Sequence, residues 1–287
     1  MKMIKKSLIQ SDKHKQNCLV EKNILLNSIN PFIIKLYYTF QDNNNLYFIL
    51  DYVEQGDLYH FLLNNLKNLS EKYTVFIIAQ IILGLQYLHE NNYIYRDLKP
   101  ENILINRKGY IKLADFGLSK IKTEKEDKCQ TICGTLYYMA PEIMFESQGY
   151  DESVDWWSLG IILYEIYHGL PPFYQSKNQM EILQKYNEEQ IQINSDINPN
   201  ARDLIHKLLQ KKPKDRIGYQ NVDDIKNHSY FKDINWKKLY NQSLKAPKIH
   251  NLNKSLAKTE IFNFKEDNEH QISSYCKISN FTCSNNQ

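Results

Sequence analysis

Residues 95–102 bring three chemically useful side chains together in one short stretch. Asp97 is followed two residues later by Lys99 and five residues later by Asn102. A carboxylate in such a position can accept the proton of an attacking hydroxyl, and an ammonium group can lie against a phosphoryl group during its transfer. The stretch therefore predicts Asp97 as a general base and Lys99 as a phosphate-side cation.

Two short β-rich runs follow and position a fourth side chain. Residues 103–105 and 110–114 flank the turn sequence at 106–109, which predicts a hairpin. Folding this hairpin back brings Asn102 next to Asp115. An amide oxygen and a carboxylate together make a hard-oxygen site suited to Mg²⁺ held with substrate phosphates. An ordinary loop and hairpin with solvated charges is the alternative, because each motif is weak alone and only the joint spacing is informative.

The bulk composition fits a globular protein of one or two domains. The chain has 287 residues, of which 42% are hydrophobic and 24% charged, and a net charge of +3. This small excess, without a basic block, argues against a nucleic-acid partner. The two most apolar runs, residues 75–85 and 156–167, are shorter than the ~20 residues that span a bilayer, and residues 1–10 contain no apolar signal-peptide core. We therefore expect no membrane span.

The five cysteines lack the paired spacing of a metal site. Reduced thiols are the expected state, which favours a cytoplasmic location with access to the nucleus left open.

The combination of Asp97, Lys99 and Asn102 with Asp115-Phe116-Gly117, eighteen residues after Asp97, resembles the catalytic core of eukaryotic protein kinases. Tyr95 stands in place of the usual histidine, a variation of the AGC group, to which the cyclic-nucleotide-dependent kinases and protein kinase B belong. The resemblance implies an α+β, bilobal protein-kinase fold. Its parts would be a truncated, β-rich small lobe at 1–53, a mainly helical large lobe at 54–231, and an AGC-type tail at 232–287 that is partly disordered.

By this resemblance, residues 1–4 end the third kinase strand, and Lys2 is the lysine that holds the ATP phosphates. Ser11 predicts the N-cap of a helix that runs to about residue 29. Glu21 falls on the apolar face that this helix would present through Cys18, Leu25 and Ile29. A carboxylate on such a face is costly unless it is paired, so we expect an ion pair between Glu21 and Lys2.

Two further β-rich runs, 32–40 and 46–53, resemble the hairpin that leads into the kinase hinge. The resemblance implies that Asp51 and Val53 offer backbone groups to adenine and that Asp57 meets the ribose. An acid at a helix N-terminus is the alternative for Asp57. ATP and Mg²⁺ are the implied cofactors, and the remaining implied nucleotide contacts come from Lys2, Glu101, Asn102, Leu104 and Asp115.

Residues 131–142 resemble the AGC activation segment. Thr131 matches its phosphorylated threonine, which implies an upstream activating kinase, with Arg96 and Lys120 as the cations for the phosphate. The resemblance further implies that Thr135 bridges Asp97 and Lys99. Two structural contacts are implied as well, an ion pair between Glu142 and Arg216 and an anchor from Asp155 to the catalytic-loop backbone. The charged stretch 123–128 predicts a mobile loop.

The tail contains one further candidate phosphosite. Residues 278–283 resemble a degraded hydrophobic motif with Thr282 at its phosphosite, and a disordered polar tail with stray aromatic residues is the equal alternative.

The chain departs from the family in its small lobe and in the segment that receives substrate. The chain begins at the third strand, without the Gly-rich loop, and Leu136-Tyr137 replaces the common Pro-Glu. We expect residues 1–287 alone to be a poor kinase, and a truncated gene of an active kinase is favoured over a true pseudokinase.

The sequence as a whole predicts an ATP-dependent, monomeric serine/threonine kinase that phosphorylates protein hydroxyls in a basic context. A pseudokinase that serves as a nucleotide-binding scaffold is the alternative from another class, because the Gly-rich loop is absent. A small-molecule kinase is disfavoured by the sequences at 131–142 and 155–160.

Overall fold

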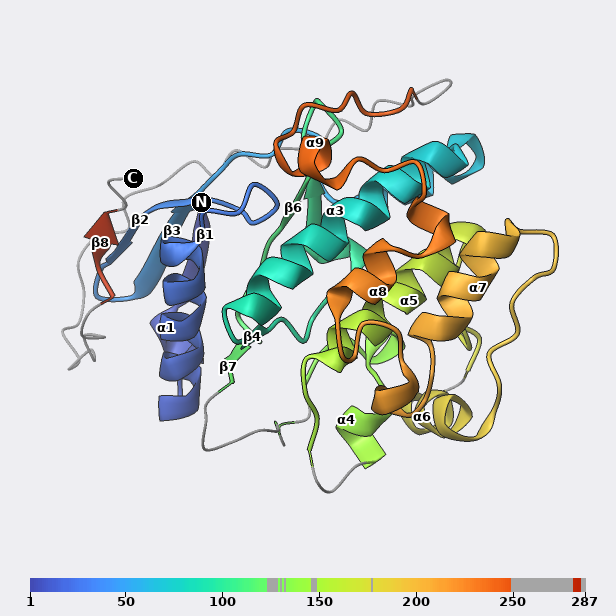
Figure 1. Cartoon of the computed structure of the whole chain (residues 1–287). Coiled ribbons are helices and arrows are strands. Elements are labelled where there is room, and N and C mark those ends of the chain that lie inside the picture. Colours follow the sequence, from blue (N-terminus) through green and yellow to red (C-terminus); the bar gives the residue numbers. More distant parts are fainter. Residues whose placement is uncertain are drawn as a thin grey trace.

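The computed structural model describes residues 1–122, 129, 131, 133–145, 149–176, 178–248 and 281–284. A small β-rich part and a larger helical part lie side by side, with the small part at the left of Figure 1. The α+β class and the division into a β-rich part and a helical part agree with the expectation from the sequence.

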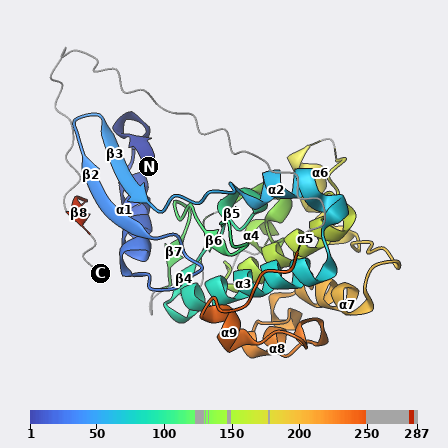
Figure 2. The ribbon, with the colours of Figure 1, turned by 90° about the horizontal axis from the view of Figure 1, so that it is seen from above.

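The small part is a four-stranded sheet covered by one helix. The strand order is β1-β3-β2-β8, with β1 at Lys2–Lys5, β2 at Leu36–Gln41, β3 at Asn45–Leu50 and β8 at Cys283–Ser284. All three pairings are antiparallel. Helix α1, Asp12–Asn27, lies along this sheet in Figure 2.

Helix α1 begins where the sequence predicted and ends earlier. The Ser11 side chain accepts a hydrogen bond from the His14 backbone N–H, as expected of an N-cap. Ser28 is already extended at the C-terminal end, so Ile29 lies beyond the helix and is 77% exposed. The prediction that Ile29 shares the buried face of Glu21 is therefore wrong, because the helix does not reach it.

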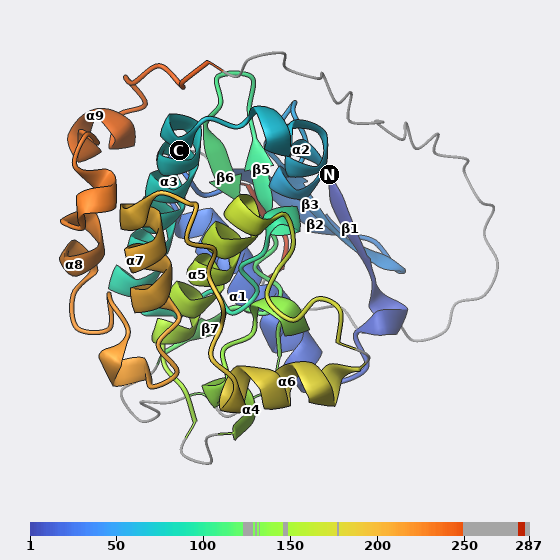
Figure 3. The ribbon, with the colours of Figure 1, turned by 90° about the vertical axis from the view of Figure 1, so that its right-hand side faces the viewer.

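The larger part is built around two buried helices, α3 at Glu71–Glu90 and α5 at Ser153–His168, which pack against each other. Helix α7, Pro199–Leu208, packs on α5 with a stripe of buried aliphatic side chains. Figure 3 shows α8, Val222–Lys226, and α9, Trp236–Tyr240, following α7 along one side. The remaining helices are α2 at Leu58–Asn65, α4 at Glu142–Phe145 and α6 at Gln179–Glu188.

Two small antiparallel ribbons lie between the sheet and the helices. Strands β5, Ile103–Ile105, and β6, Ile111–Leu113, form the predicted hairpin, and β4, Tyr93–Ile94, pairs with β7, Lys120–Ile121. Because these strands pair, the segments that contain Asp97 and Asp115 lie next to each other.

The hairpin turn also meets the segment that leaves the helical part. Gly109 has φ +81°, and a Cβ added there would lie 2.7 Å from the Ala246 Cβ. The Tyr110 hydroxyl donates to the Leu244 carbonyl oxygen at 2.6 Å. Glycine is therefore required at this turn both by its backbone angle and by the close approach of residues 242–247.

Within the described residues, no helix combines the length and the apolar content that crossing a membrane requires.

Candidate functional site

A buried carboxylate holds the catalytic-loop backbone in place. Asp155, on the first turn of α5, is fully buried and accepts hydrogen bonds from the backbone N–H groups of Tyr95 at 3.0 Å and Arg96 at 2.8 Å. Arg96 has φ 68°, a left-handed conformation that is costly for a long side chain. Because these hydrogen bonds fix the strained turn, the loop presents Asp97 in one orientation.

Asp97 lies within a compact polar cluster. Thr135 Oγ1 donates to Asp97 Oδ1 at 2.9 Å and accepts from Lys99 Nζ at 2.7 Å, and Lys99 Nζ is also 3.0 Å from Asp97 Oδ2. The Asn102 amide donates to the Asp97 carboxylate at 3.0 Å and to its backbone carbonyl at 2.8 Å. The bridge by Thr135 that the resemblance implied is therefore present.

The hairpin brings Asn102 and Asp115 to the same end of the ribbon. The backbone N–H of Ala114 donates to the Asn102 carbonyl at 2.9 Å, which sets Asp115 beside the catalytic loop. Asp115 adopts φ 57°, and about half of its side-chain surface is exposed. Since the Asn102 NH₂ group is bonded to Asp97, its amide oxygen stays available as an acceptor.

The oxygen atoms of Asn102 and Asp115 suit a Mg²⁺ ion that is shared with substrate phosphates, and not a metal ion held by protein ligands alone. Within the described residues, no three His, Cys, Asp or Glu side chains gather around one point. Mg²⁺ is usually held by one or two protein oxygens together with substrate phosphates, and it prefers oxygen ligands. Asn102 and Asp115 match that pattern.

Lys2 joins the small sheet to this cluster. Its Nζ is 2.6 Å from Glu21 Oε1 on α1 and 3.0 Å from Asp115 Oδ1. The expected Lys2–Glu21 pair is present, whereas the contact with Asp115 was not foreseen. Burial opposes the lysine charge, but the two carboxylates outweigh it, so the pKa of Lys2 is raised. Burial also acts against ionisation of Asp115, but the Lys2 charge and hydrogen bond hold its pKa below the ordinary value.

Tyr95 ties the catalytic loop to the strand before Asp115. Its ring is fully buried, its hydroxyl donates to the Ala114 carbonyl oxygen, and its centroid lies 5.1 Å from that of Phe116. Tyr95, which stands where the usual kinase sequence has a histidine, therefore links the catalytic loop to the residue before Asp115.

The hinge residues lie between the two parts, with several of their polar groups already bonded. The Asp51 backbone N–H donates to the Lys35 carbonyl oxygen at 2.9 Å, so the predicted adenine contact of Asp51 would have to come from its backbone carbonyl. The Asp51 carboxylate pairs with Lys112 at 2.9 Å. Val53 is half-buried and follows β3.

Asp57 and Leu104 form a backbone bridge at the edge of the hairpin. The Asp57 carboxylate caps α2 by accepting from the His60 backbone N–H at 2.8 Å, and it also contacts the His60 ring. This is the helix-capping alternative considered for Asp57, so a ribose contact would have to share the carboxylate with the cap.

A second acidic residue, missed by the sequence reasoning, lies near Glu101. Glu165 of α5 is 8% exposed and accepts a hydrogen bond from the Tyr138 hydroxyl at 2.7 Å. Burial, with a smaller contribution from the Glu101 charge, raises the pKa of Glu165 to about 7. The only sequence signal was the Glu165 carboxylate inside an otherwise apolar run.

The raised pKa of Glu165 predicts a pH-dependent stability. The folded chain keeps this proton at pH values where the unfolded chain has released it, so the free energy of unfolding falls as pH rises from about 5 to about 8. Glu165→Gln, which retains the Tyr138 contact, should remove up to about 3 kcal/mol of that fall. Urea unfolding across this range tests it, with the exposed Glu188→Gln as control. Identical pH profiles for Glu165→Gln and the parent chain would contradict the assignment.

Thr131 is linked to Arg96 through one tyrosine. The Tyr150 hydroxyl donates to the Thr131 carbonyl at 2.6 Å and accepts from an Arg96 guanidinium nitrogen at 3.2 Å. Arg96 Nε donates to the Leu118 carbonyl at 2.6 Å, and Lys120 lies on β7. The predicted mobile loop at 123–128 lies outside the described residues.

The end of the chain returns to the small sheet. Phe281 is fully buried and meets Phe48 edge-to-face at 5.3 Å, and its carbonyl accepts from Thr39 Oγ1 at 2.5 Å. Thr282 is exposed, and β8 follows it and pairs with β2. Residues 281–284 are therefore ordered on the sheet; residues 249–280, where partial disorder was also expected, lie outside the described residues.

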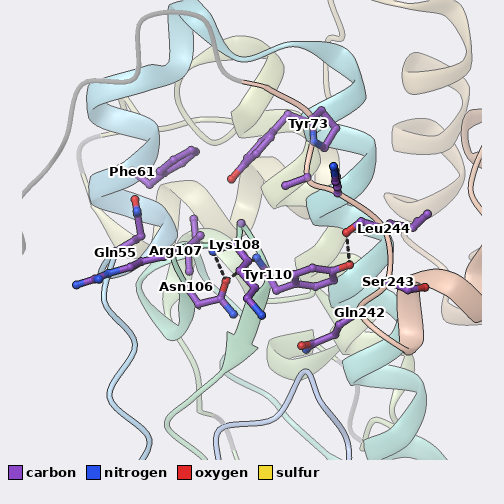
Figure 4. Close-up of a pocket in the computed structure, with 15 residues that line it drawn as sticks. Gln55, Phe61, Tyr73, Asn106, Arg107, Lys108, Tyr110, Gln242, Ser243 and Leu244 are labelled. Carbon is purple, nitrogen blue, oxygen red and sulfur yellow. Dashed lines mark hydrogen bonds between the residues drawn. The ribbon is translucent and has the colours of Figure 1, made fainter.

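A cavity of about 500 Å³ lies on the far side of the hairpin turn. Figure 4 shows Tyr73 and Tyr110 facing it, with residues 242–244 along its edge. No residue of the Asp97 cluster lines it, so we assign this cavity to packing of the exit segment.

The arrangement of Asp97, Lys99, Asn102, Asp115, Lys2 and Glu21 agrees with what is known of related chains. The family pattern described as "Protein kinase domain" matches residues 1–231. The chain belongs to the protein kinase family. Members of this family use ATP and Mg²⁺.

Comparison with individual proteins shows which members of the family the chain is similar to. It is 42% identical to serine/threonine-protein kinase sgk-1 of Caenorhabditis elegans over 251 residues, 87% of this chain and 54% of that protein. It is 41% identical to serine/threonine-protein kinase gad8 of Schizosaccharomyces pombe over 86% of this chain and 43% of that protein. Serine/threonine-protein kinase Sgk1 of Xenopus tropicalis is 42% identical over 86% of this chain and 59% of that protein. The AGC-group recognition is confirmed, and the kinase spans about half the length of these relatives.

Proposed function

We propose that the kinase transfers the γ-phosphoryl group of ATP to serine or threonine hydroxyls of protein substrates. The observation that carries the proposal is the cluster in which Thr135 joins Asp97 to Lys99 beside Asn102 and Asp115. The relatives of this chain are named serine/threonine-protein kinases, which supports serine and threonine hydroxyls as the acceptors.

The chain's own residues divide the work. Asp97 accepts the proton of the substrate hydroxyl, and its orientation is held by Asn102 and Thr135. Lys99 carries positive charge to the side where the phosphoryl group moves. Bound Mg²⁺ would neutralise phosphate charge, with Asn102 and Asp115 as its protein ligands.

Lys2, held by Glu21, anchors the α- and β-phosphates in this proposal. The contact of Lys2 with Asp115 gives the lysine a second role, because a cation between Glu21 and Asp115 reduces the repulsion between the two carboxylates. Asp51, Val53, Asp57, Glu101 and Leu104 complete the proposed nucleotide site.

The proposed substrates carry arginine two or three residues before the phosphorylated hydroxyl. Glu101 and Glu165 support this, because both carboxylates border the groove next to Thr135. A peptide array probed with the full-length protein should show stronger phosphorylation with arginine than with glutamine there, and the difference should shrink with added salt. A preference for acidic or proline-directed sites would contradict the proposal.

Thr131 and Thr282 are the proposed phosphorylation sites of the kinase itself. Phosphate on Thr131 adds a charge of about −1.5 to −2 that Arg96 and Lys120 can order, so phosphorylation by an upstream kinase should raise activity. Full activity of Thr131→Ala, compared with the exposed Ser195→Ala as control, would refute this switch.

We further propose that the kinase acts as a monomer in the cytoplasm, with 1–53 and 54–231 as its two lobes and 232–287 as the tail. Among the described residues, Cys18, Cys133 and Cys283 are free thiols, which is consistent with a reducing compartment. Sedimentation of the full-length protein tests the monomeric state, and cell fractionation tests the cytoplasmic location.

A further inference from the structure

An apolar groove of about 660 Å³ lies between α2, the turn at 136–138 and the turn at 169–174. Its walls contain large apolar side chains that are open to solvent. Tyr59, Leu63, Leu170 and Tyr174 are between 37% and 66% exposed. Isolated exposed apolar residues are ordinary, but four that line one hollow indicate a binding surface.

Acidic groups border the same hollow. Glu101 and Glu165 both line it, and the described residues supply neither carboxylate with an ion-pair partner. Glu165 is almost fully buried, and its one hydrogen bond comes from a neutral tyrosine hydroxyl. A buried carboxylate without a counter-charge favours a cationic ligand, so the occupant must combine positive charge with apolar surface.

The groove is continuous with the catalytic cluster. Thr135 lines it and hydrogen-bonds directly to Asp97. A peptide whose hydroxyl reaches Asp97 therefore runs into the groove with its neighbouring residues. This continuity, together with the charge, identifies the occupant as the substrate peptide itself.

Tyr137 gives the groove its aromatic character. It stands where the common kinase sequence has an acid, and its ring lies 5.3 Å from that of Tyr174 at an interplanar angle of 33°. Compared with the common kinase sequence, the wall of the groove therefore has an aromatic pair in place of a carboxylate. Aromatic pairs of this kind offer a further ring both apolar area and favourable edge contacts.

We propose that this groove selects an aromatic or large aliphatic residue in the substrate, close to the arginine that precedes the phosphorylated hydroxyl. Tyr137, Tyr174 and Leu63 are the specificity-determining residues. This inference rests on the proposed function, because it assumes that the groove's peptide is the kinase substrate.

Peptide binding tests the selection without requiring turnover. Fluorescence anisotropy would compare three peptides with alanine at the acceptor position: one with arginine and phenylalanine, one with phenylalanine replaced by serine, and one with arginine replaced by glutamine. The first should bind about tenfold more tightly than the second, the expected effect of burying one large apolar side chain. Loss of arginine should also weaken binding.

Groove variants make the test specific. Tyr174→Ser and Leu63→Ser should weaken the phenylalanine peptide about tenfold and leave the serine peptide unchanged. Tyr240→Ser and Ile29→Ser, at residues that are also exposed but lie outside the groove, should change neither. Equal affinities of the first two peptides for the parent chain, no detectable binding of the phenylalanine peptide, or equal losses for both peptides in Tyr174→Ser would overturn the proposal.

The binding test separates this inference from the proposed function. Selective binding without phosphoryl transfer in the full-length protein would sustain the groove assignment and refute the kinase activity. Phosphoryl transfer to peptides that does not depend on the apolar residue would support the kinase activity and refute the groove assignment.

Discussion

Replacing Asp115 by alanine is expected to abolish the Mg²⁺ dependence of ATP binding, whereas Asp97→Ala should keep ATP affinity within a few-fold of the parent. Asp115 is a proposed metal ligand that also pairs with Lys2, so its loss removes both the metal site and one partner of the phosphate anchor. Asp97 contacts the acceptor hydroxyl in our proposal and no phosphate. Calorimetric titration of ATP with and without Mg²⁺ measures the difference.

The same pair of variants should separate binding from catalysis. Asp97→Ala should lower phosphoryl transfer by about 10²–10⁴-fold, the usual contribution of a positioned general base. Asp203→Ala, at a half-exposed acid on α7, is the matched control and should change neither property. If Asp115→Ala bound ATP with the parent's Mg²⁺ dependence, the metal assignment would be wrong.

Arg216→Met should destabilise the kinase by about 3–5 kcal/mol. Both side chains of the Arg216–Glu142 pair are almost completely buried, with nitrogen–oxygen distances of 2.7 and 3.1 Å. Arg216 also donates to the Ser153 carbonyl at 2.8 Å. Removing the guanidinium leaves Glu142 as a buried carboxylate without a counter-charge, which is far more costly than losing a surface contact.

The matched control for this prediction is Arg107→Met. The Arg107 side chain is 78% exposed, and its nitrogen–oxygen distance to Glu54 is 3.9 Å. An exposed pair of this kind is worth about 0–1 kcal/mol. Urea denaturation of both variants measures the two effects, and similar losses for Arg216→Met and Arg107→Met would show that the buried pair does not hold α4 to the helical core.

Local sequence patterns were sufficient for the elements that position the catalytic groups. The turn at 106–109 predicted the β5–β6 hairpin, and the hairpin brings Asn102 and Asp115 together because strand pairing is a local consequence of that turn. Ser11 likewise fixed the start of α1, since a side-chain cap is encoded within four residues. The end of α1 was placed too late because Ile29 looks like a face residue until the extended Ser28 is known.

Contacts between distant segments were less accessible from sequence. Glu165 is 64 residues beyond Glu101 in the chain, and only the packing of α5 behind residues 136–138 brings it to the same groove. The Lys2–Asp115 contact depends on how the two parts of the molecule meet, and the Phe281–Phe48 contact depends on the end of the chain returning to the small sheet. The periodicity and spacing of residues within one segment do not predict contacts between distant segments.

The most direct test of the central claim is transfer of labelled phosphate. The full-length protein and its Asp97→Ala variant would be incubated with γ-labelled ATP, Mg²⁺ and a peptide that contains arginine, serine and tyrosine, and mass spectrometry would locate the phosphate. Our account predicts label on serine, none on tyrosine, and almost none with Asp97→Ala. Robust ATP binding without transfer by the parent protein, or equal transfer by the variant, would contradict it.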